Sequence, residues 1–160
     1  MERLKKISER KARETVVNFQ RYLFDLIDWN QRLIIILGQR GTGKTTMLLQ
    51  KMKQVSKSSI YLSLDDIYFE ANRLVFLADK LHEQGYRFLF LDEVHRYKYW
   101  SKDIKSVYDN YPDIKMIVTG SSILDIQKGQ ADLSRRSTIY QLAGMSFREF
   151  IHLEHDIKID

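Results

Sequence analysis

The sequence predicts an α/β fold, in which a parallel β-sheet carries helices on both faces. From Leu33 onward, strand-like apolar runs alternate with helical patterns, which is typical of parallel strands joined by crossover helices. The run Leu33–Leu37 is apolar at every position, as expected for a central strand that is covered on both sides. A glycine-rich turn at residues 38–45 joins this run to a helical pattern. These three observations indicate a doubly covered parallel sheet with a tight turn after its first strand.

The chain before Leu33 is expected to form an amphipathic helix from about Ser8 to Asp28. Apolar side chains recur there at helical spacing, with Arg, Lys and Glu between the early ones, at Val16, Phe19, Leu23, Leu26 and Ile27. We therefore interpret residues 1–32 as an N-terminal amphipathic helix that packs on the core.

Four more strands and four helices are expected after the first strand. The strands are 59–63, 87–91, 115–119 and 138–142, and the helices are 44–57, 72–84, 100–110 and 123–127. Gly85 occupies the left-handed cap position after the second of these helices, and Pro112 ends the third. Asp65 and Asp66 follow the strand at 59–63, and we interpret them as capping and loop residues rather than catalytic carboxylates.

The turn after the first strand reads Gly-Gln-Arg-Gly-Thr-Gly-Lys-Thr at residues 38–45, which is a P-loop. Glycine lets the backbone turn tightly, so that N–H groups can wrap a phosphate chain at close range. Lys44 is expected to contact the outer phosphates, and the Thr45 hydroxyl is expected to ligate Mg²⁺. The residues expected to contact the nucleotide are Gly38, Gln39, Arg40, Gly41, Thr42, Gly43, Lys44, Thr45 and Thr46. The strand before the turn and the helix after it disfavour the alternative, a glycine turn that carries a lysine by chance.

The strand at 87–91 is followed by the acidic pair Asp92–Glu93. Ligands gather at the carboxyl ends of parallel strands, so this pair should lie at the same edge of the sheet as the P-loop. We predict that Asp92 holds Mg²⁺ through a coordinated water and that Glu93 polarises the attacking water. An acidic pair that caps a helix is the alternative. The second acid favours hydrolysis over phosphotransfer to a metabolite, and no lid-like insertion is evident in the sequence.

Four further residues are candidates for the site. Thr119 ends a strand, and after the two preceding motifs it would lie near the γ-phosphate and orient the water, with helix capping as the alternative. Arg135 and Arg136 are either surface charge or an arginine finger that reaches a phosphate in a neighbouring subunit of a homo-oligomer. Position slightly favours Arg136 as the finger. Trp29 is a candidate wall for the adenine base, although simple packing is the favoured interpretation.

The composition suits one globular domain, since 44% of the 160 residues are hydrophobic and 29% are charged. The chain has no cysteine, which excludes disulfides and thiolate metal sites. No apolar run approaches the length of a membrane helix, and the first ten residues lack a signal-peptide core, so a cytoplasmic location without membrane contact is expected. The net charge of +5 admits a nucleic-acid partner, but the basic residues are spread along the chain, and a solvated surface is the favoured interpretation.

Four motifs together resemble one family of proteins. They are the P-loop, Leu-Asp-Glu-Val-His at 91–95 followed by Trp100, Thr-Gly-Ser-Ser at 119–122, and Leu-Ala-Gly-Met-Ser-Phe-Arg-Glu-Phe at 142–150. This set is similar to that of the prokaryotic AAA-type ATPases in which an N-terminal ATPase domain precedes a C-terminal domain of unknown function. The resemblance runs from about the first strand to Phe150, and the last two motifs are the ones that narrow it beyond P-loop proteins in general.

The resemblance implies a three-layer P-loop NTPase fold with a five-stranded parallel sheet in the order 5-1-4-3-2. It also implies Mg·ATP as the ligand, Thr119 as sensor 1, and Arg135 or Arg136 near the place of the arginine finger. We assign residues 33–150 to the ATPase core, and we expect residues 151–160 to begin a C-terminal region that is missing from the chain.

We expect a Mg²⁺-dependent ATPase that couples ATP hydrolysis to a conformational change in an attached domain or a protein partner. The ordered set of Lys44, Thr45, Asp92, Glu93 and Thr119 supports this hypothesis. The alternative is a nucleotide-dependent switch, or a DNA-associated regulatory module, that binds ATP with little turnover.

Overall fold

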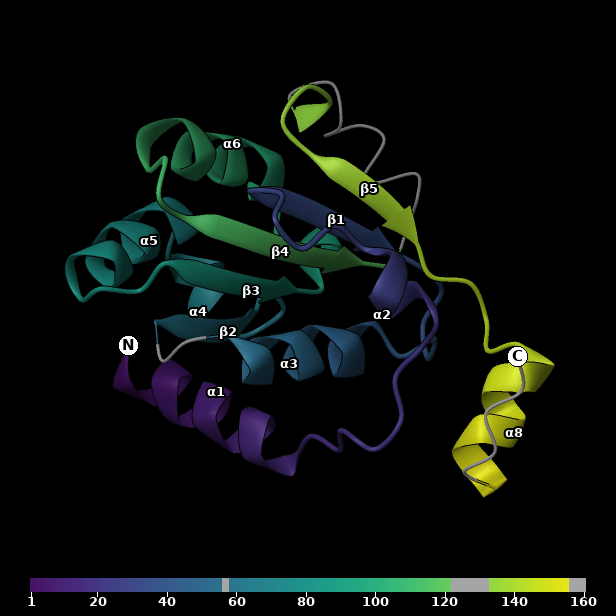
Figure 1. Ribbon diagram of the computed structural model, residues 1–160. Helices are drawn as coiled ribbons and strands as arrows, with labels where there is room; N and C mark the ends of the chain where they lie inside the picture. The colour runs from purple at the N-terminus through teal and green to yellow at the C-terminus, as the bar shows by residue number, and fades with distance from the viewer. Residues whose placement is uncertain (56–57, 122–132, 156–160) are drawn as a thin grey trace.

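The computed structural model describes residues 1–55, 58–121 and 133–155, and it contains a central β-sheet flanked by helices (Figure 1). The elements along the chain are α1 (Glu2–Glu14), α2 (Leu23–Leu26), β1 (Leu33–Leu37), α3 (Lys44–Gln54), β2 (Ser59–Ser63), α4 (Tyr68–Ala71), α5 (Leu74–Glu83), β3 (Phe88–Asp92), η1 (Val94–Arg96), α6 (Trp100–Asn110), β4 (Lys115–Gly120), β5 (Thr138–Gln141) and α8 (Phe147–His155). The strand order is β2-β3-β4-β1-β5, and all four neighbouring pairs are parallel. The predicted α/β fold and the order 5-1-4-3-2 are therefore confirmed.

The central strand β1 explains the three layers, because its side chains alternate between two separate cores. Leu33, Ile35 and Leu37 pack with residues of α5 and α6 on one face. Ile34 and Ile36 pack with residues of α2 and α3 on the other face. All five side chains are between 0% and 3% exposed, which is why the run is apolar at every position.

The strands that carry the motifs have their carboxyl ends on the same side of the sheet, which we call the P-loop edge. β1 and β4 are in register, with Leu37 opposite Gly120. β2 and β3 end together, with Ser63 opposite Asp92. The chain leaves β1 into the P-loop at Gly38, so the P-loop and Asp92 lie at the same edge, as the sequence predicts.

The N-terminal helix differs from the prediction. α1 ends at Glu14, residues 15–22 are not helical, and only the short α2 follows. The predicted helix from Ser8 to Asp28 is therefore wrong. Val16 and Leu26, which were expected to face the core, are 66% and 73% exposed.

Tertiary hydrogen bonds explain the path of residues 15–22. The side-chain amide of Gln50 on α3 donates to the carbonyl oxygens of Val16 (3.1 Å) and Phe19 (2.6 Å). Lys53 Nζ, on the same helix, donates to the carbonyl oxygen of Thr15 (2.9 Å). These donors satisfy carbonyl groups that a continuous helix would have bonded internally. Apolar periodicity alone cannot reveal such partners.

α1 lies against β2, which is an outermost strand of the sheet (Figure 1). The Ser8 hydroxyl accepts a hydrogen bond from the backbone N–H of Tyr61 in β2 (2.9 Å). Leu4, one turn earlier, is 4% exposed and joins the core that contains α5 and α6. The helix therefore covers an edge strand whose backbone groups would otherwise be open to pairing with another chain.

The remaining elements follow the predictions closely, with small differences at their ends. The strand at 59–63 and the helix at 100–110 have the predicted bounds, whereas α4 was not predicted. Gly85 has φ +87°, as a left-handed cap requires, and Asp66 Oδ1 accepts from the N–H of Tyr68 (2.9 Å) in a capping role. The helix predicted at 123–127 lies outside the described residues. In the part of the chain that is described, no helix has the length and apolar character needed to cross a bilayer.

Candidate nucleotide-binding site

The P-loop connects the end of β1 to the start of α3. Gly41 and Gly43 have φ angles of +84° and +93°, which residues with a side chain rarely adopt. Such glycine conformations allow successive N–H groups to converge on an anion, and the N-terminus of α3 adds its positive dipole end. Of the predicted contacts, those exposed to solvent are Gln39, Arg40, Gly41 and Thr46.

Lys44 is buried inside the P-loop. It is 4% exposed, and its ammonium group donates to the carbonyl oxygens of Gly38 (2.8 Å) and Gln39 (2.8 Å). Burial lowers the pKa of Lys44, while the negative charges of Glu93 and Asp92 oppose that shift. The loop therefore contains a cation that a phosphate oxygen could attract away from neutral carbonyl partners.

Two of the predicted site residues bond a third, Asp92, which is 2% exposed. Thr45 Oγ1 donates to Asp92 Oδ2 (2.7 Å), and Thr119 Oγ1 donates to Asp92 Oδ1. A fourth residue, Tyr61, donates its hydroxyl to Asp92 Oδ2 (2.8 Å). We call Thr45, Tyr61, Asp92 and Thr119 the Asp92 cluster. The fold brings its members together from α3, β2, β3 and β4.

Tyr61 is the member of this cluster that the sequence did not reveal. It lies opposite Phe90 in the β2–β3 pairing and is 3% exposed. Burial, with the negative charge of Asp92, raises the pKa of Tyr61 far above its usual value, so the hydroxyl remains a neutral donor. Strand register is the signal that could have found it. Tyr61 lies opposite Phe90, so it faces the same side of the sheet as Phe90 and as Asp92, which is two residues further along β3.

Glu93 leaves the strand in an unusual backbone conformation. Among the described residues it is the one non-glycine residue with positive φ (+54°). Its N–H donates to Thr119 Oγ1 (3.3 Å) and to Asp92 Oδ1 (3.2 Å). Its carboxylate is 29% exposed and lies 3.4 Å from His95 Nε2, which in turn lies 2.9 Å from Ser121 Oγ. Glu93 therefore combines a left-handed backbone with a half-buried carboxylate next to the buried Asp92, and such strain is typical of functional sites.

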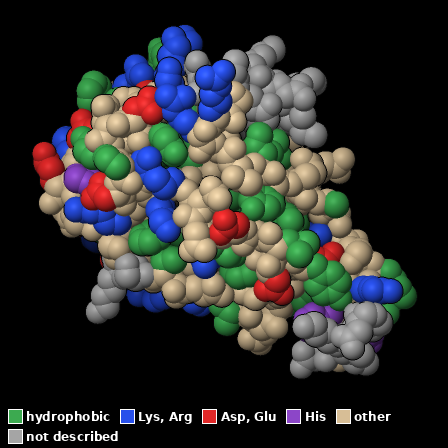
Figure 2. Space-filling view, turned by 45° about the horizontal axis from the view of Figure 1, so that its top comes forward, with side chains coloured by type: hydrophobic (Ala, Val, Ile, Leu, Met, Phe, Trp, Pro, Cys, Tyr) green, Lys and Arg blue, Asp and Glu red, His purple; other side chains and the backbone are tan. Residues whose placement is uncertain are grey.

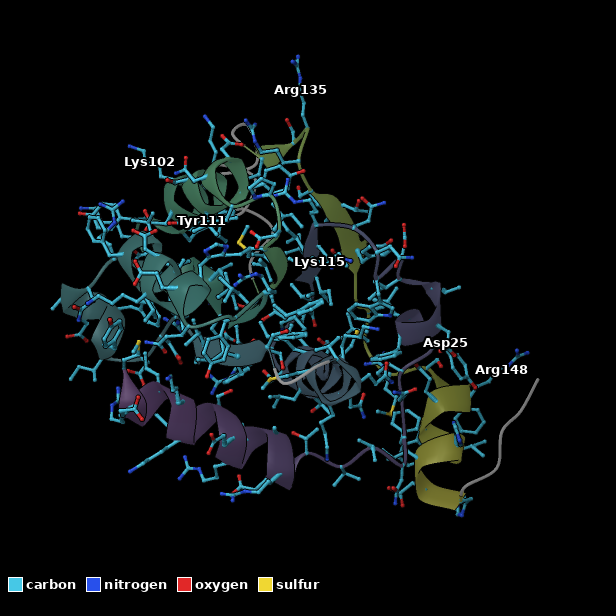
Figure 3. All side chains as sticks on the ribbon, turned by 60° about the vertical axis from the view of Figure 1, so that its left-hand side comes forward. Asp25, Lys102, Tyr111, Lys115, Arg135 and Arg148 are labelled. Atoms are coloured by element: carbon cyan, nitrogen blue, oxygen red, sulfur yellow. The ribbon has the colours of Figure 1, made fainter. Side chains whose placement is uncertain are left out.

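The structure does not bring the two arginines to the P-loop of the same chain. Arg135 and Arg136 precede β5, which runs parallel to β1, so they lie at the edge of the sheet opposite the P-loop. Arg136 forms a two-pronged ion pair with Asp109 (2.8 and 3.1 Å), and it holds the pKa of that carboxyl below its usual value. Arg135 is exposed and extends away from the body of the fold (Figure 3).

The residues at the P-loop edge fit Mg²⁺ in the company of a nucleotide. Across residues 1–55, 58–121 and 133–155, no group of three or more His, Cys, Asp or Glu side chains is placed to hold a metal ion. Thr45 and Asp92 nevertheless present two adjacent oxygen ligands. Mg²⁺ is commonly held by one or two such protein oxygens together with phosphate oxygens and water. The donor set therefore fits an ion that arrives with its nucleotide.

Trp29 packs within the protein. Its indole N–H donates to the carbonyl oxygen of Phe24 (2.9 Å), and the two ring centroids are 4.9 Å apart. Lys51 Nζ lies 5.0 Å from the centroid of the same indole. These contacts agree with the favoured interpretation of this residue as a packing side chain.

Basic side chains are unevenly spread over the face of the molecule shown in Figure 2. On this face they gather toward the top, with an acidic side chain among them, and apolar side chains are interspersed below. The net charge is +5.

Comparison with known proteins identifies the family. The AAA domain family matches residues 30–151. An uncharacterized protein of Methanocaldococcus jannaschii is 32% identical over 143 residues, and the alignment covers 81% of this chain but only 30% of that protein. A chain from the structure titled "Structural Basis for Katanin Self-Assembly" shares the fold, with a TM-score of 0.53 and 16% identity over 71% of this chain and 41% of that chain. The protein therefore belongs to the AAA domain family, and its site is of the nucleotide-binding ATPase kind.

Proposed function

We propose that this chain binds Mg·ATP at the P-loop edge and hydrolyses it, and that hydrolysis changes the conformation of an attached domain or a protein partner. The observation that carries the proposal is the Asp92 cluster, in which Thr45 and Thr119 bond one buried carboxylate whose charge acts on the lysine of the P-loop. We retain residues 33–150 as the ATPase core, with residues 1–32 packed on it and residues 151–160 as the start of a C-terminal region.

The P-loop residues would bind and neutralise the phosphates. Lys44 would exchange its two carbonyl acceptors for phosphate oxygens, which are charged and therefore stronger partners. Backbone N–H groups between Gly38 and Thr46 would supply the remaining donors. Each of these interactions strengthens as charge accumulates on the transferring phosphoryl group.

Thr45 and Asp92 would hold Mg²⁺, which neutralises phosphate charge when it is bound. For this role the Thr45 hydroxyl would turn its oxygen toward the ion instead of donating to Asp92. Asp92 would accept from water bound at the ion, while Tyr61 continues to orient the carboxylate from β2. The buried position of Asp92 keeps this acceptor in one orientation.

Glu93 would polarise the attacking water, because its carboxylate is the more exposed of the acidic pair. Thr119 accepts the N–H of Glu93 and donates to Asp92, so it links the proposed base to the proposed metal ligand. A general base contributes about 10²–10⁴ in rate. Arg135 or Arg136 would supply positive charge from a second copy of the chain.

The test separates binding from turnover. We expect Glu93→Gln to bind ATP with nearly unchanged affinity. Its turnover rate should fall about 10²–10⁴-fold, since only proton removal is affected. The matched control is Glu83→Gln, which changes an exposed acid on α5. Unchanged turnover in Glu93→Gln would show that Glu93 is not the base. Equal, negligible ATP binding by the unchanged chain and by Lys44→Ala would overturn the proposed function.

The alternative function, a switch that binds ATP with little turnover, is favoured by one observation. Arg136 is already paired with Asp109, and both arginines lie at the edge opposite the P-loop of their own chain. An isolated copy therefore offers its own nucleotide no arginine from this pair. Tight ATP binding with a turnover that stays low at every protein concentration would support the switch, whereas turnover per chain that rises with concentration would support the ATPase.

A further inference from the structure

Arg21 joins the P-loop to the last described helix. Its Nη1 donates to the carbonyl oxygen of Thr42 in the P-loop. Its Nη2 donates to the carbonyl oxygens of Ala143 (2.9 Å) and Gly144 (3.1 Å), which follow β5. Its Nε donates to Glu149 Oε1 on α8 (2.8 Å). One guanidinium, 7% exposed, therefore bonds the P-loop to the segment that follows β5 and to the first turn of α8, which are distant from the P-loop in the sequence.

Glu149 completes the connection on α8. It is 5% exposed, and in addition to Arg21 it accepts from the backbone N–H of Tyr22 (3.0 Å) and of Ser146 (2.9 Å). The backbone N–H of Glu149 donates to the Ser146 hydroxyl (3.2 Å), and together with the bond from the Ser146 N–H this forms a capping box. The Ser146 hydroxyl also donates to Glu149 Oε2 (3.0 Å). The first turn of α8 is thereby fixed to Arg21.

The segment between β5 and α8 also presses on the other end of the P-loop. A Cβ atom on Gly38 would lie 2.4 Å from the carbonyl oxygen of Leu142, so the two backbones are in direct contact. The N–H of Leu142 donates to the carbonyl oxygen of Leu37 (2.6 Å). The P-loop is therefore held at Gly38 by the chain leading to α8, and at Thr42 by Arg21.

α8 itself projects away from the body of the fold (Figure 1). Its side chains Phe147, Phe150 and Leu153 are 76%, 49% and 47% exposed, so they do not anchor the helix in the core. His152 makes an edge contact with Phe19, with ring centroids 5.3 Å apart. The buried ion pair of Arg21 with Glu149 is thus the strongest described attachment of α8 to the body of the fold.

We propose that Arg21 is a positioning residue that couples nucleotide binding at the P-loop to the orientation of α8. When the N–H groups of the P-loop bind phosphate, the carbonyl group of Thr42 shifts with them. If an acceptor moves away from a buried guanidinium, the interaction is lost and the free energy rises, because no water takes the place of the acceptor. Arg21 therefore follows Thr42 and moves Glu149, and with it the first turn of α8. The inference rests on the proposed function and names the path by which that function would reach the rest of the protein.

The experiment measures ATP-analogue binding and the amide hydrogen exchange of α8 in the same samples. The probe is Mg²⁺ with a non-hydrolysable ATP analogue. In the unchanged protein we expect the analogue to alter exchange at residues 147–155 by at least about fivefold, the lower end of usual allosteric couplings. In Arg21→Lys the analogue still binds, but the exchange of α8 no longer responds. Lysine keeps the charge but cannot donate to Thr42, Ala143 and Glu149 together.

Two further variants make the result specific. Glu149→Gln keeps the size of the side chain and removes the ion pair, so we expect it to weaken the same response without abolishing binding. Arg10→Lys, on the exposed side of α1, should respond like the unchanged protein. Thermal unfolding of each variant shows whether it is folded, and a fold defect would reduce exchange protection with and without the analogue alike.

The outcomes distinguish the two proposals. An unchanged protein that binds the analogue without any change at α8 would overturn the coupling and leave ATP binding intact. A full response in both Arg21→Lys and Glu149→Gln would show that Arg21 is not the path. Failure of the unchanged protein to bind the analogue would overturn the proposed function, and the coupling with it.

Discussion

Three hydroxyl groups stabilise the buried carboxylate of Asp92 by donating hydrogen bonds to it. Thr45 and Tyr61 share Oδ2, and Thr119 bonds Oδ1. A buried carboxylate without such donors would be costly, because the interior solvates a charge poorly. The donors also hold Asp92 in one rotamer, and a metal ligand held in one rotamer binds its ion without first being ordered.

Removing one of these donors is expected to reduce stability measurably. Tyr61→Phe deletes the hydroxyl that donates to Asp92 Oδ2 and keeps the ring that packs in the core. We expect a loss of about 1–3 kcal/mol in the free energy of unfolding, since a buried acceptor loses one partner. Denaturant titration checks this, and Tyr99→Phe, at a residue 39% exposed, is the control with an expected change below about 0.5 kcal/mol. Equal stability of both variants would mean that the Tyr61 hydroxyl contributes little.

At the scale of elements, the contact between the P-loop and the chain after β5 decides the geometry of the site. Gly38 and Leu142 touch through their backbones, and Arg21 bonds both segments. A loop held at two points can be rigid although it carries two glycines with positive φ. The same contacts make the P-loop sensitive to small changes in the segment that leads to α8.

A methyl group at Gly38 is expected to disrupt this contact. Its Cβ would lie 2.4 Å from a backbone oxygen, which has no room to move without shifting β5 or the loop. We expect Gly38→Ala to lower the free energy of unfolding by about 1–3 kcal/mol, the usual cost of overpacking. Gly144→Ala is the control, because a Cβ there meets nothing within 4 Å. If denaturant titration found both variants equally stable, the two backbones could not be in the contact described.

The attachment of α8 is expected to depend on pH. Burial would raise the pKa of Glu149, but hydrogen bonds from Arg21, Ser146 and Tyr22 outweigh it and lower the pKa to about 2, from an ordinary value of 4.5. Because the folded-state pKa is the lower one, the stabilisation is complete above about pH 4.5 and is lost as the pH falls toward 2. The shift corresponds to roughly 3 kcal/mol.

Unfolding measurements between pH 2 and pH 6 check this expectation. We expect Glu149→Gln to show a smaller pH dependence in this range than the unchanged protein, because its amide does not titrate, whereas carboxyls such as Asp103 and Asp109, whose pKa values are also lowered, still do. Glu154→Gln, at an exposed position of the same helix, should keep it. Identical pH profiles for Glu149→Gln and the unchanged protein would contradict the assignment.

At the scale of the whole molecule, the two halves of the proposed catalytic machinery lie at opposite edges of the sheet. The P-loop follows the end of β1, and Arg135 precedes the start of the parallel strand β5. One copy of the chain cannot bring them together without unfolding the sheet. Only a second copy can place an arginine of this pair near the phosphates.

Mixing two inactive variants tests this arrangement. Lys44→Ala lacks a working P-loop but keeps its arginines, and the double variant of Arg135→Ala with Arg136→Ala has the converse defect. We expect each alone to lose turnover and the mixture to regain part of it, since an arginine finger contributes about 10³–10⁵ in rate. A mixture no more active than its components would exclude a finger from this pair. Loss of the ion pair of Arg136 with Asp109 should change the stability of the double variant little, because the pair is exposed to solvent.

Most of the fold could be predicted because its signals are local. Strand β2 and helix α6 have the predicted bounds, since apolar periodicity and one proline define them. The predicted sheet order is confirmed too, although it came from the resemblance and not from periodicity. The N-terminal helix was mispredicted because the carbonyl groups of residues 15–19 bond side chains of α3, a partner that no local pattern reveals.

The P-loop, the acidic end of β3 and their meeting at the carboxyl ends of the strands could be inferred from the chain alone, because glycine spacing and the alternation of strands and helices are local patterns. The side chains that support them become evident only in the folded protein. Tyr61 reaches Asp92 across 31 positions of sequence, and Arg21 reaches Glu149 across 128. Contacts of that range depend on strand register and on the path of loops, and a single sequence carries no period or spacing that records either.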